Sequence, residues 1–266
     1  MTKGDILLMH GAFVGGWVFE RLRAELSRRG WKTHAPDLPF HGSAQAGAPA
    51  HPDLMRQGLA EYRSAMTAEI HRITQAPDMA ARPAPVLIGH SLGGLLAQQL
   101  AAQNLASAAV LLAPVAPWGT LPHTRWEMET VYGLLKEGNI ARKAMVPDFN
   151  IAAHYSMDRI PPALQRDIFA RLVPESGRVL FETLLWWMDW HAASHVATHR
   201  VQVPMLVLCG SDDKVTPPSS CRAVARRYPG RAVFREIPEL SHFIFGEPQE
   251  DAVITLVADW LDEHAT

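Results

Sequence analysis

The 266-residue sequence has only two cysteines, no long hydrophobic run and no excess of either charge, with 25 basic and 27 acidic residues. A membrane-spanning helix needs about 20 consecutive apolar residues, and no run approaches this length. A formal net charge of −2 offers no basic stripe for phosphates and no polybasic segment for anionic lipids. We therefore expect neither a nucleic acid nor a membrane as a partner.

The cysteines and the N-terminus indicate a reducing compartment. Cys209 lies within an apolar run and Cys221 in the segment that follows, so we expect two reduced core residues rather than a disulfide. Neither cysteine belongs to a metal or redox motif. A strand pattern begins already at Asp5, without the charged, apolar and small-residue succession of a signal peptide. The sequence thus predicts a cytoplasmic protein.

Short apolar or β-branched runs alternate with longer segments of helical periodicity. This alternation is typical of a parallel sheet covered by helices on both faces, and a 48% content of hydrophobic residues is enough for a large core. We predict an α/β fold with a doubly wound, mostly parallel sheet of about six strands. The predicted strands cover residues 6–9, 32–35, 86–88, 109–112, 205–208 and 232–237, and the predicted helices cover residues 17–29, 54–74, 92–103, 218–228 and 249–264.

The alternation stops between residues 117 and 200, where prolines interrupt helical patterns and no convincing strand occurs. We interpret residues 117–200 as a helical cap inserted after the fourth strand, between a first core part at 1–116 and a second at 201–266. Five of the eight tryptophans fall within this segment, more aromatic weight than a small helical layer needs for its own core. Some of these side chains are therefore expected to line a pocket.

Residues 89–93, Gly-His-Ser-Leu-Gly, stand where a predicted strand turns directly into a predicted helix. Such a turn imposes an unusual backbone conformation on Ser91. Close packing of the strand and the helix leaves no room for side chains two residues away, where Gly89 and Gly93 lie. The free backbone N–H groups of the new helix point back towards the serine and can bind a negative oxygen. The pattern is that of a nucleophile elbow, with Ser91 as the nucleophile.

With this elbow and four further segments, the chain resembles the α/β-hydrolase family, most of all its small, lidded carboxylesterase and hydroxynitrile-lyase-like branch. The resemblance implies a serine, an acid and a histidine in this chain order, and two backbone N–H groups that bind an oxyanion. We expect no cofactor. The segments that carry the resemblance are "LLMHGAFVGGW" at 7–17, "APDLPFHGSA" at 35–44, "GHSLGG" at 89–94, "LCGSDDKVTPP" at 208–218 and "LSHFIFGEP" at 240–248.

The resemblance places the acid after a late strand, where two aspartates compete. The family pattern favours Asp213 over Asp212, because a branched residue follows Asp213 two positions later and a proline four positions later. Among thirteen histidines, His242 lies between the last predicted strand and the last predicted helix, and it matches the family's catalytic histidine. The predicted catalytic residues are therefore Ser91, Asp213 and His242.

The resemblance to the family also implies roles for the residues around the serine. We expect the oxyanion hole to consist of the backbone N–H groups of Ala12, in the His-Gly motif after the first strand, and Leu92, directly after the serine. His10 and His90 are interpreted as structural residues. The residues expected to line the substrate pocket are Phe13, Trp118, Trp186, Trp187, Trp190 and Phe243.

Three histidines, His191, His195 and His199, fall four residues apart in a predicted helix that begins with the tryptophans at 186, 187 and 190. Two histidines on one helical face can bind zinc, but no acidic partner lies on that face. We favour an ordinary polar face or pocket wall and expect no metal.

The expected reaction is hydrolysis of a small or medium, largely apolar carboxylic ester through an acyl-enzyme. The serine at the elbow argues against haloalkane dehalogenases and epoxide hydrolases, which have aspartate there. Phe243 stands where hydroxynitrile lyases of this type have lysine. Carbon–carbon bond (diketone) hydrolases, thioesterases, lactonases and perhydrolases share the predicted triad and stay open, as does a non-catalytic ligand receptor. A homodimer is left open as an assembly.

Overall fold

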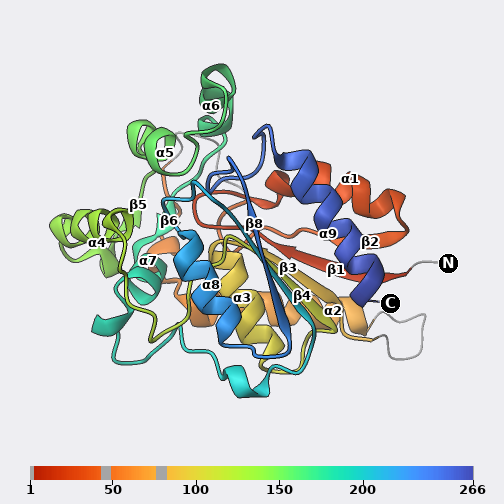
Figure 1. Ribbon diagram of the computed structural model, residues 1–266. Helices are drawn as coiled ribbons and strands as arrows, with labels where there is room; N and C mark the ends of the chain where they lie inside the picture. Colours follow the sequence, from red (N-terminus) through yellow and green to blue (C-terminus); the bar gives the residue numbers. More distant parts are fainter. Residues whose placement is uncertain (1–2, 43–48, 76–82, 266) are drawn as a thin grey trace.

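The core of the protein is a six-stranded sheet in the order β2-β1-β3-β4-β7-β8, in which every neighbouring pair is parallel (Figure 1). The computed structural model describes residues 3–42, 49–75 and 83–265. Strands β3, β4 and β7 are buried along their whole length, as their nearly continuous apolar sequences require. The strands are β1 (Gly4–Met9), β2 (Trp31–His34), β3 (Val86–His90), β4 (Ala108–Leu112), β7 (Met205–Gly210) and β8 (Ala232–Ile237).

Helices cover both faces of this sheet, which confirms the predicted doubly wound α/β fold. Helices α1 (Glu20–Arg28) and α9 (Glu250–His264) pack against each other on one face. The other face carries α2 (Leu59–Thr74), α3 (Leu92–Ala101) and α8 (Pro218–Arg226), because right-handed crossovers that run in one direction along the sheet place their helices on one side. Two short 3₁₀ turns, η1 (Gly16–Phe19) and η2 (Leu54–Arg56), precede α1 and α2.

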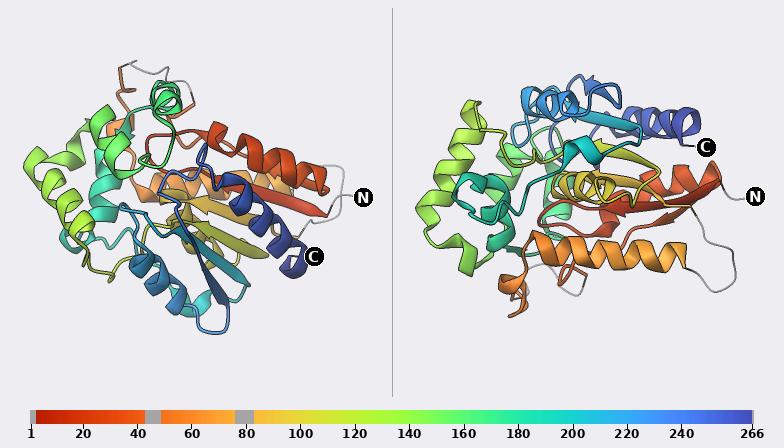
Figure 2. Two further views of the ribbon diagram at one scale, coloured as in Figure 1. Left: turned by 45° about the horizontal axis from the view of Figure 1, so that its top comes forward. Right: turned by 90° about the horizontal axis from the view of Figure 1, so that it is seen from below.

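The segment between β4 and β7 contains four helices among its described residues, grouped on the side of the sheet where the parallel strands end and opposite both termini (Figure 2). They are α4 (Arg125–Glu137), α5 (Phe149–Tyr155), α6 (Pro162–Phe169) and α7 (Gly177–Leu184), with the turn η3 (Ile140–Arg142) after α4. The sequence predicted no strand here, but β5 (Ala144–Met145) and β6 (Glu175–Ser176) form a short antiparallel pair. Two-residue strands have no periodicity to detect, so the pattern could not reveal them.

The helix predicted over residues 186–199 is wrong. Only the turns η4 (Trp186–Met188) and η5 (Thr198–Arg200) form there. The carboxylate of Asp189 accepts hydrogen bonds from the backbone N–H groups of His191 and Ala193 at 3.0 and 2.7 Å, and Ala192 has a φ of 47°. An aspartate that binds the backbone just after it favours a turn over a helix. The three histidines therefore do not share a helical face.

Both cysteines are buried and free, as predicted. Cys209 ends its apolar run within β7, and Cys221 lies on α8, the helix that packs against this strand. No helix in residues 3–42, 49–75 and 83–265 is both long enough and apolar enough to span a membrane.

The packing of β3 against α3 depends on glycines on both sides of the turn between them. A Cβ atom on Gly89 would lie 2.1 Å from the carbonyl oxygen of Gly93, and a Cβ atom on Gly93 would lie 2.0 Å from the carbonyl oxygen of Met9. These atoms are all backbone, so no side chain can rotate away. The helix can approach the sheet this closely only without side chains at the two positions.

Gly93→Ala should therefore destabilise the protein by at least about 2 kcal/mol, because the backbone itself would have to shift. The matched control is Gly133→Ala in α4, where a Cβ atom meets nothing within 4 Å. That change should be neutral or stabilising by up to about 1 kcal/mol, since alanine favours helix over glycine. Urea unfolding of both variants measures the difference, and equal stabilities would contradict this account of the turn.

Candidate active site

Ser91 stands alone between β3 and α3 in a conformation that few non-glycine residues adopt, with φ 52° and ψ −114°. Neighbouring strands hold this turn: the Ser91 N–H donates to the Leu112 carbonyl at 2.9 Å, and the Ser91 carbonyl accepts from Val115 at 3.0 Å. Strain of this kind persists only where the surrounding structure fixes it, and it is common at functional sites. The Ser91 hydroxyl faces His242 at the edge where the parallel strands end.

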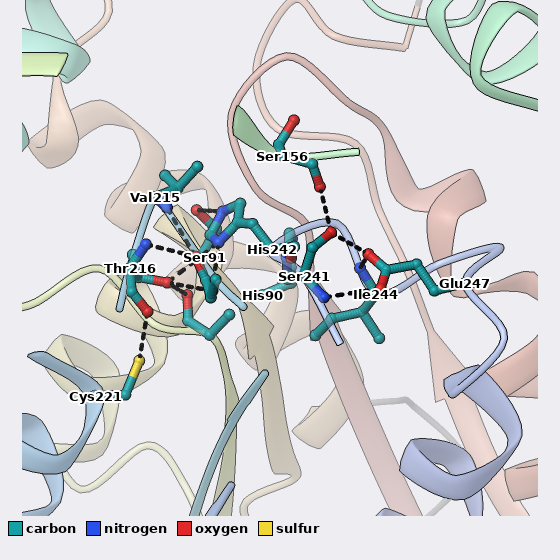
Figure 3. A network of polar contacts seen from close by, with 12 residues as sticks. His90, Ser91, Ser156, Val215, Thr216, Cys221, Ser241, His242, Ile244 and Glu247 are labelled. Atoms are coloured by element: carbon teal, nitrogen blue, oxygen red, sulfur yellow. Dashed lines mark hydrogen bonds and ion pairs between the residues drawn. The ribbon is translucent and has the colours of Figure 1, made fainter. Parts of the chain in front are cut away.

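Ser91, His242 and Asp213 form one hydrogen-bonded chain. His242 Nε2 lies 3.0 Å from Ser91 Oγ (Figure 3). His242 Nδ1 lies 2.9 Å from Asp213 Oδ2. All three residues are buried. The three side chains come from loops after β3, β7 and β8, which parallel strands bring to the same edge of the sheet. A base placed between a hydroxyl and a carboxylate in this way can take the hydroxyl proton.

The structure brings Asp213, not Asp212, to the histidine. Asp213 Oδ1 accepts from the backbone N–H groups of Val215 and Thr216 at 2.8 and 2.7 Å, and Thr216 Oγ1 lies 3.0 Å from the other carboxylate oxygen. Asp212 instead forms an ion pair with Arg159, on the segment between β4 and β7. Thr216, which also lies 3.2 Å from His242 Nδ1, was not identified from the sequence. Its position three residues after the acid was the available signal.

A buried glutamate orders the loop that carries His242. Glu247 accepts from the backbone N–H groups of Ser241 at 2.8 Å and Ile244 at 3.3 Å, and from the Ser241 hydroxyl (Figure 3). Burial raises the pKa of Glu247 above its ordinary value, although these hydrogen bonds oppose the rise. Nothing in the sequence distinguished Glu247 from a surface glutamate, because its partners become neighbours only when the loop closes.

His90 links the elbow to the same loop. Its Nε2 donates to the carbonyl of His242 at 2.9 Å, and among the described residues its Nδ1 has no partner. Burial, and then the nearby His242, lower the pKa of His90 to about 3. His10 is likewise buried, and its pKa is lowered to about 4 by burial and by His41. Both rings are therefore neutral in the folded protein at neutral pH, as expected of structural residues.

The predicted oxyanion donors lie on two elements that touch. A Cβ atom on Gly11 would lie 3.1 Å from Ser91 Cβ, so the loop after β1 passes directly beside the elbow. Phe13 has a φ of 66°, and its carbonyl accepts from the Val173 N–H at 2.9 Å. Within the described part of the chain, the N–H groups of Ala12 and Leu92 donate to no protein acceptor. Both are thus available to an oxygen of a bound molecule.

The six predicted pocket residues differ in their burial and in their aromatic contacts. Phe243 is buried beside the histidine and packs against Phe245, and Phe13 is half-buried in the loop after β1. Trp118, Trp186 and Trp187 form an aromatic cluster with centroid distances of 5.1 and 5.8 Å. Trp190 is 98% exposed and lines no pocket, which corrects its assignment. It falls within the Asp189 turn that replaces the predicted helix.

The segment between β4 and β7 contacts both loops that carry the acid and the histidine. The Ser156 carbonyl accepts from the Ser241 hydroxyl at 3.0 Å (Figure 3). It also accepts from the Phe243 N–H at 2.9 Å. Lys214, beside Asp213, forms an ion pair with Asp158 at 2.8 Å. Residues 156–158 therefore lie against the site rather than apart from it.

Comparison with known proteins places this arrangement in a family. Residues 6–254 match the Alpha/beta hydrolase family. The chain belongs to this family. The match extends through the segment between β4 and β7 and includes all three residues of the hydrogen-bonded chain.

Relatives of this α/β hydrolase include esterases and other hydrolases. The pimeloyl-[acyl-carrier protein] methyl ester esterase of Chromobacterium violaceum is 28% identical over 272 residues, which cover 98% of this chain and 95% of the relative. The pyrethroid hydrolase of Sphingobium wenxiniae is 24% identical over 268 residues, which cover 100% of this chain and 90% of the relative. The crystal structure of the Paleococcus ferrophilus monoacylglycerol lipase has a TM-score of 0.71 and 22% identity, covering 98% and 95% of the two chains. The lipase shares the fold of this chain, and the two sequence relatives support a hydrolase with ester hydrolysis as its general chemistry.

The two aspartates can be separated by matched variants. Asp213→Asn should lower kcat by about 10⁴-fold, because an amide cannot hold the histidine in the required tautomer or stabilise its cation. Asp212→Asn removes only the partly exposed ion pair with Arg159 and should change kcat less than about threefold. Steady-state hydrolysis of a p-nitrophenyl ester measures both, and a larger loss for Asp212→Asn would reverse the assignment.

The neutral buried histidines predict a loss of stability in acid. In the unfolded chain both gain protons near pH 6.5, whereas the folded protein resists protonation until about pH 4 at His10 and about pH 3 at His90. The free energy of unfolding should therefore fall as the pH is lowered from 6.5, by up to about 1.4 kcal/mol per pH unit for each histidine. Urea unfolding between pH 7 and 4.5 measures how steeply the free energy of unfolding depends on pH. This dependence should be shallower for His90→Gln than for the wild type. The exposed-site control His71→Gln should keep the wild-type slope, and an unchanged slope in His90→Gln would refute the assignment.

Proposed function

We propose that this α/β hydrolase is a serine-dependent carboxylic ester hydrolase, with Ser91 as nucleophile, His242 as general base and acid, and Asp213 as the carboxylate that orients the histidine. The observation that carries the proposal is the continuous hydrogen-bonded chain, at 3.0 and 2.9 Å, from the serine hydroxyl to a buried aspartate. The similarity to a methyl ester esterase and to a pyrethroid hydrolase supports the same chemistry.

The proposed reaction has two halves. Ser91 Oγ attacks the ester carbonyl while His242 Nε2 takes the hydroxyl proton, and the imidazolium then protonates the departing alcohol. Water, activated by the same nitrogen, hydrolyses the acyl-enzyme and returns the proton to Ser91. The N–H groups of Ala12 and Leu92 bind the oxyanion in both tetrahedral intermediates. Their lack of a protein acceptor, within the described residues, supports this role.

The substrate we propose is a small or medium, largely apolar ester, received between the core and a cap of residues 117–200. Phe243, next to the histidine, and Phe13, within the oxyanion loop, are apolar side chains that would face its acyl or alcohol part. Contacts of residues 156–158 with the loops of the acid and the histidine support a cap that closes directly over the chemistry. Ester hydrolysis needs no cofactor in this scheme.

Ser91→Ala should lower kcat/KM for p-nitrophenyl butyrate by about 10⁴-fold or more, because the nucleophile is lost while the rest of the site remains. The matched control is Ser64→Ala on the exposed face of α2, which should retain wild-type activity. Hydrolysis that survives in Ser91→Ala, above the buffer rate, would remove the serine from the mechanism.

A substrate series separates ester hydrolysis from related reactions of the same triad. We expect kcat/KM to be highest for p-nitrophenyl or methyl esters of short and medium acyl chains, and lower for a matched thioester, lactone and diketone. Turnover of the diketone alone would favour a carbon–carbon bond hydrolase. Saturable binding of an ester without any product, measured by calorimetry, would favour a receptor.

A further inference from the structure

A buried ion pair joins the segment between β4 and β7 to the core, and the proposed mechanism makes no use of it. His41, in the loop after β2, places its Nε2 3.1 Å from an oxygen of Glu175 in β6, and both side chains are 0% exposed. Charged groups are almost never fully buried unless they have a partner. A pair of this kind, between segments more than 130 residues apart in the sequence, therefore indicates a specific structural or functional role.

The hydrogen bonds around the pair determine its charge. His41 Nδ1 lies 3.0 Å from the Pro39 carbonyl and Nε2 faces Glu175, so next to an ionised Glu175 both ring nitrogens face acceptors and both carry a proton. Glu175 accepts in addition from the Tyr62 hydroxyl at 2.6 Å and from the Ser176 N–H at 2.7 Å. The pair is thus an imidazolium facing a carboxylate whose oxygens are both occupied.

The electrostatic surroundings agree with this assignment. Burial alone would lower the pKa of His41, but the charge and hydrogen bond of Glu175 outweigh it and raise this pKa above its ordinary value. The pKa of Glu175 is lowered, since its partners overcome the effect of burial. The other titratable groups that face His41 are Tyr62 on α2, His10 after β1 and Asp37 in its own loop.

The His41 loop lies directly against the loop that carries Ala12. His10 Nε2 accepts from the Leu38 N–H at 2.8 Å, and His10 Nδ1 donates to the Gly11 carbonyl at 2.8 Å. The ring of His10 lies 5.2 Å from that of His41. Asp37 Oδ1 accepts from the Gly16 N–H at 2.7 Å. A displacement of the His41 loop would therefore move residues 10–16.

The chain just before β6 also contacts the loop that carries Ala12. Two residues before Glu175, the Val173 N–H donates to the carbonyl of Phe13 at 2.9 Å. Phe13 follows Ala12 and has the left-handed φ of 66°, which turns the chain at this point. Residues 173–175 thus hold the oxyanion loop directly through Phe13 and indirectly through His41.

We propose that Glu175 is a positioning residue for acyl transfer, which holds the oxyanion loop through its buried ion pair with His41 so that the Ala12 N–H points at the developing oxyanion. This inference rests on the proposed ester hydrolase function and adds a role for the segment between β4 and β7. Glu175 touches no reacting atom. Its effect should therefore appear in the transition state, where the oxyanion hydrogen bonds are strongest, and little in substrate binding.

The decisive variant is Glu175→Gln, which keeps the size of the side chain and can still accept from Tyr62 and Ser176 while it donates to a neutral His41. We expect kcat for a p-nitrophenyl ester to fall about tenfold or more, with KM changed less than about threefold. The matched control is Glu182→Gln. Glu182 is also a buried glutamate; it accepts from the Leu59 N–H at 2.7 Å and pairs with Arg178 at 2.8 Å, and among the described residues it has no hydrogen bond or ion pair with residues 10–16 or 35–42. This control should keep the wild-type kcat, and circular dichroism checks that both variants are folded.

The pH profile supplies a readout that a merely structural role would not move. Below its raised pKa, His41 keeps its proton and the ion pair with Glu175 persists. As the pH rises through this pKa, His41 loses the proton and the ion pair is lost. Wild-type kcat should therefore fall on the alkaline side towards the value of Glu175→Gln, whose own kcat should lack this fall. The ¹⁵N shifts of the imidazole, measured without substrate, should report a protonated His41 at pH 7.5 in the wild type and a neutral ring in Glu175→Gln.

The outcomes separate the two proposals. Three results would overturn the positioning role and leave ester hydrolysis standing, provided that the wild type turns over. They are an unaltered kcat in Glu175→Gln, an equal loss of kcat in Glu182→Gln, and a neutral His41 in the wild type. An absence of any wild-type turnover would overturn both. A kcat loss confined to Glu175→Gln, together with a protonated wild-type His41, supports the inference.

Discussion

The close approach of the β3–α3 turn to the end of β1 is the constraint on which the rest of the site depends. Backbone meets backbone there: side chains at Gly89 or Gly93 would collide with carbonyl oxygens at about 2 Å. This approach forces Ser91 into its left-handed conformation and starts α3 directly after it. The serine oxygen therefore stands at the edge of the sheet, where loops from β1, β7 and β8 can reach it.

Around this fixed point, polar groups hold loops that would otherwise be free to move. Asp213 is held by the N–H groups of its own loop, and the loop of His242 by the carboxylate of Glu247 and the ring of His90. The segment between β4 and β7 reaches the site at residues 156–158 and again at 173–175. Each residue of the proposed triad thus sits on a loop fixed by buried hydrogen bonds, as a preorganised site requires.

Sequence reasoning was accurate where the determinants are local. The six strands and the elbow could be predicted because apolar runs, glycine spacing and the strand-to-helix junction are all contained within short windows. Asp213 was chosen over Asp212 by the residues immediately after it, and the structure brings Asp213 to the histidine.

The predicted helix over residues 186–199 failed because one side chain, Asp189, binds the backbone that follows it, a contact that helical periodicity does not register. Glu175 was missed because its partner His41 is brought to it by packing between distant segments. Thr216 and Glu247 bind groups within six residues in their own loops, and the loop conformation that creates these contacts leaves no repeating pattern. The ion pair of Glu175 with His41 spans 134 residues and leaves no pattern in the sequence.

The central claim is that Ser91 forms a covalent acyl intermediate. Rapid-quench mass spectrometry of the wild-type protein during turnover of p-nitrophenyl acetate tests it most directly. The account predicts a transient adduct with the mass of one acetyl group on the proteolytic peptide that contains Ser91. Turnover with this peptide unmodified, or with the acetyl group on another residue, would contradict it.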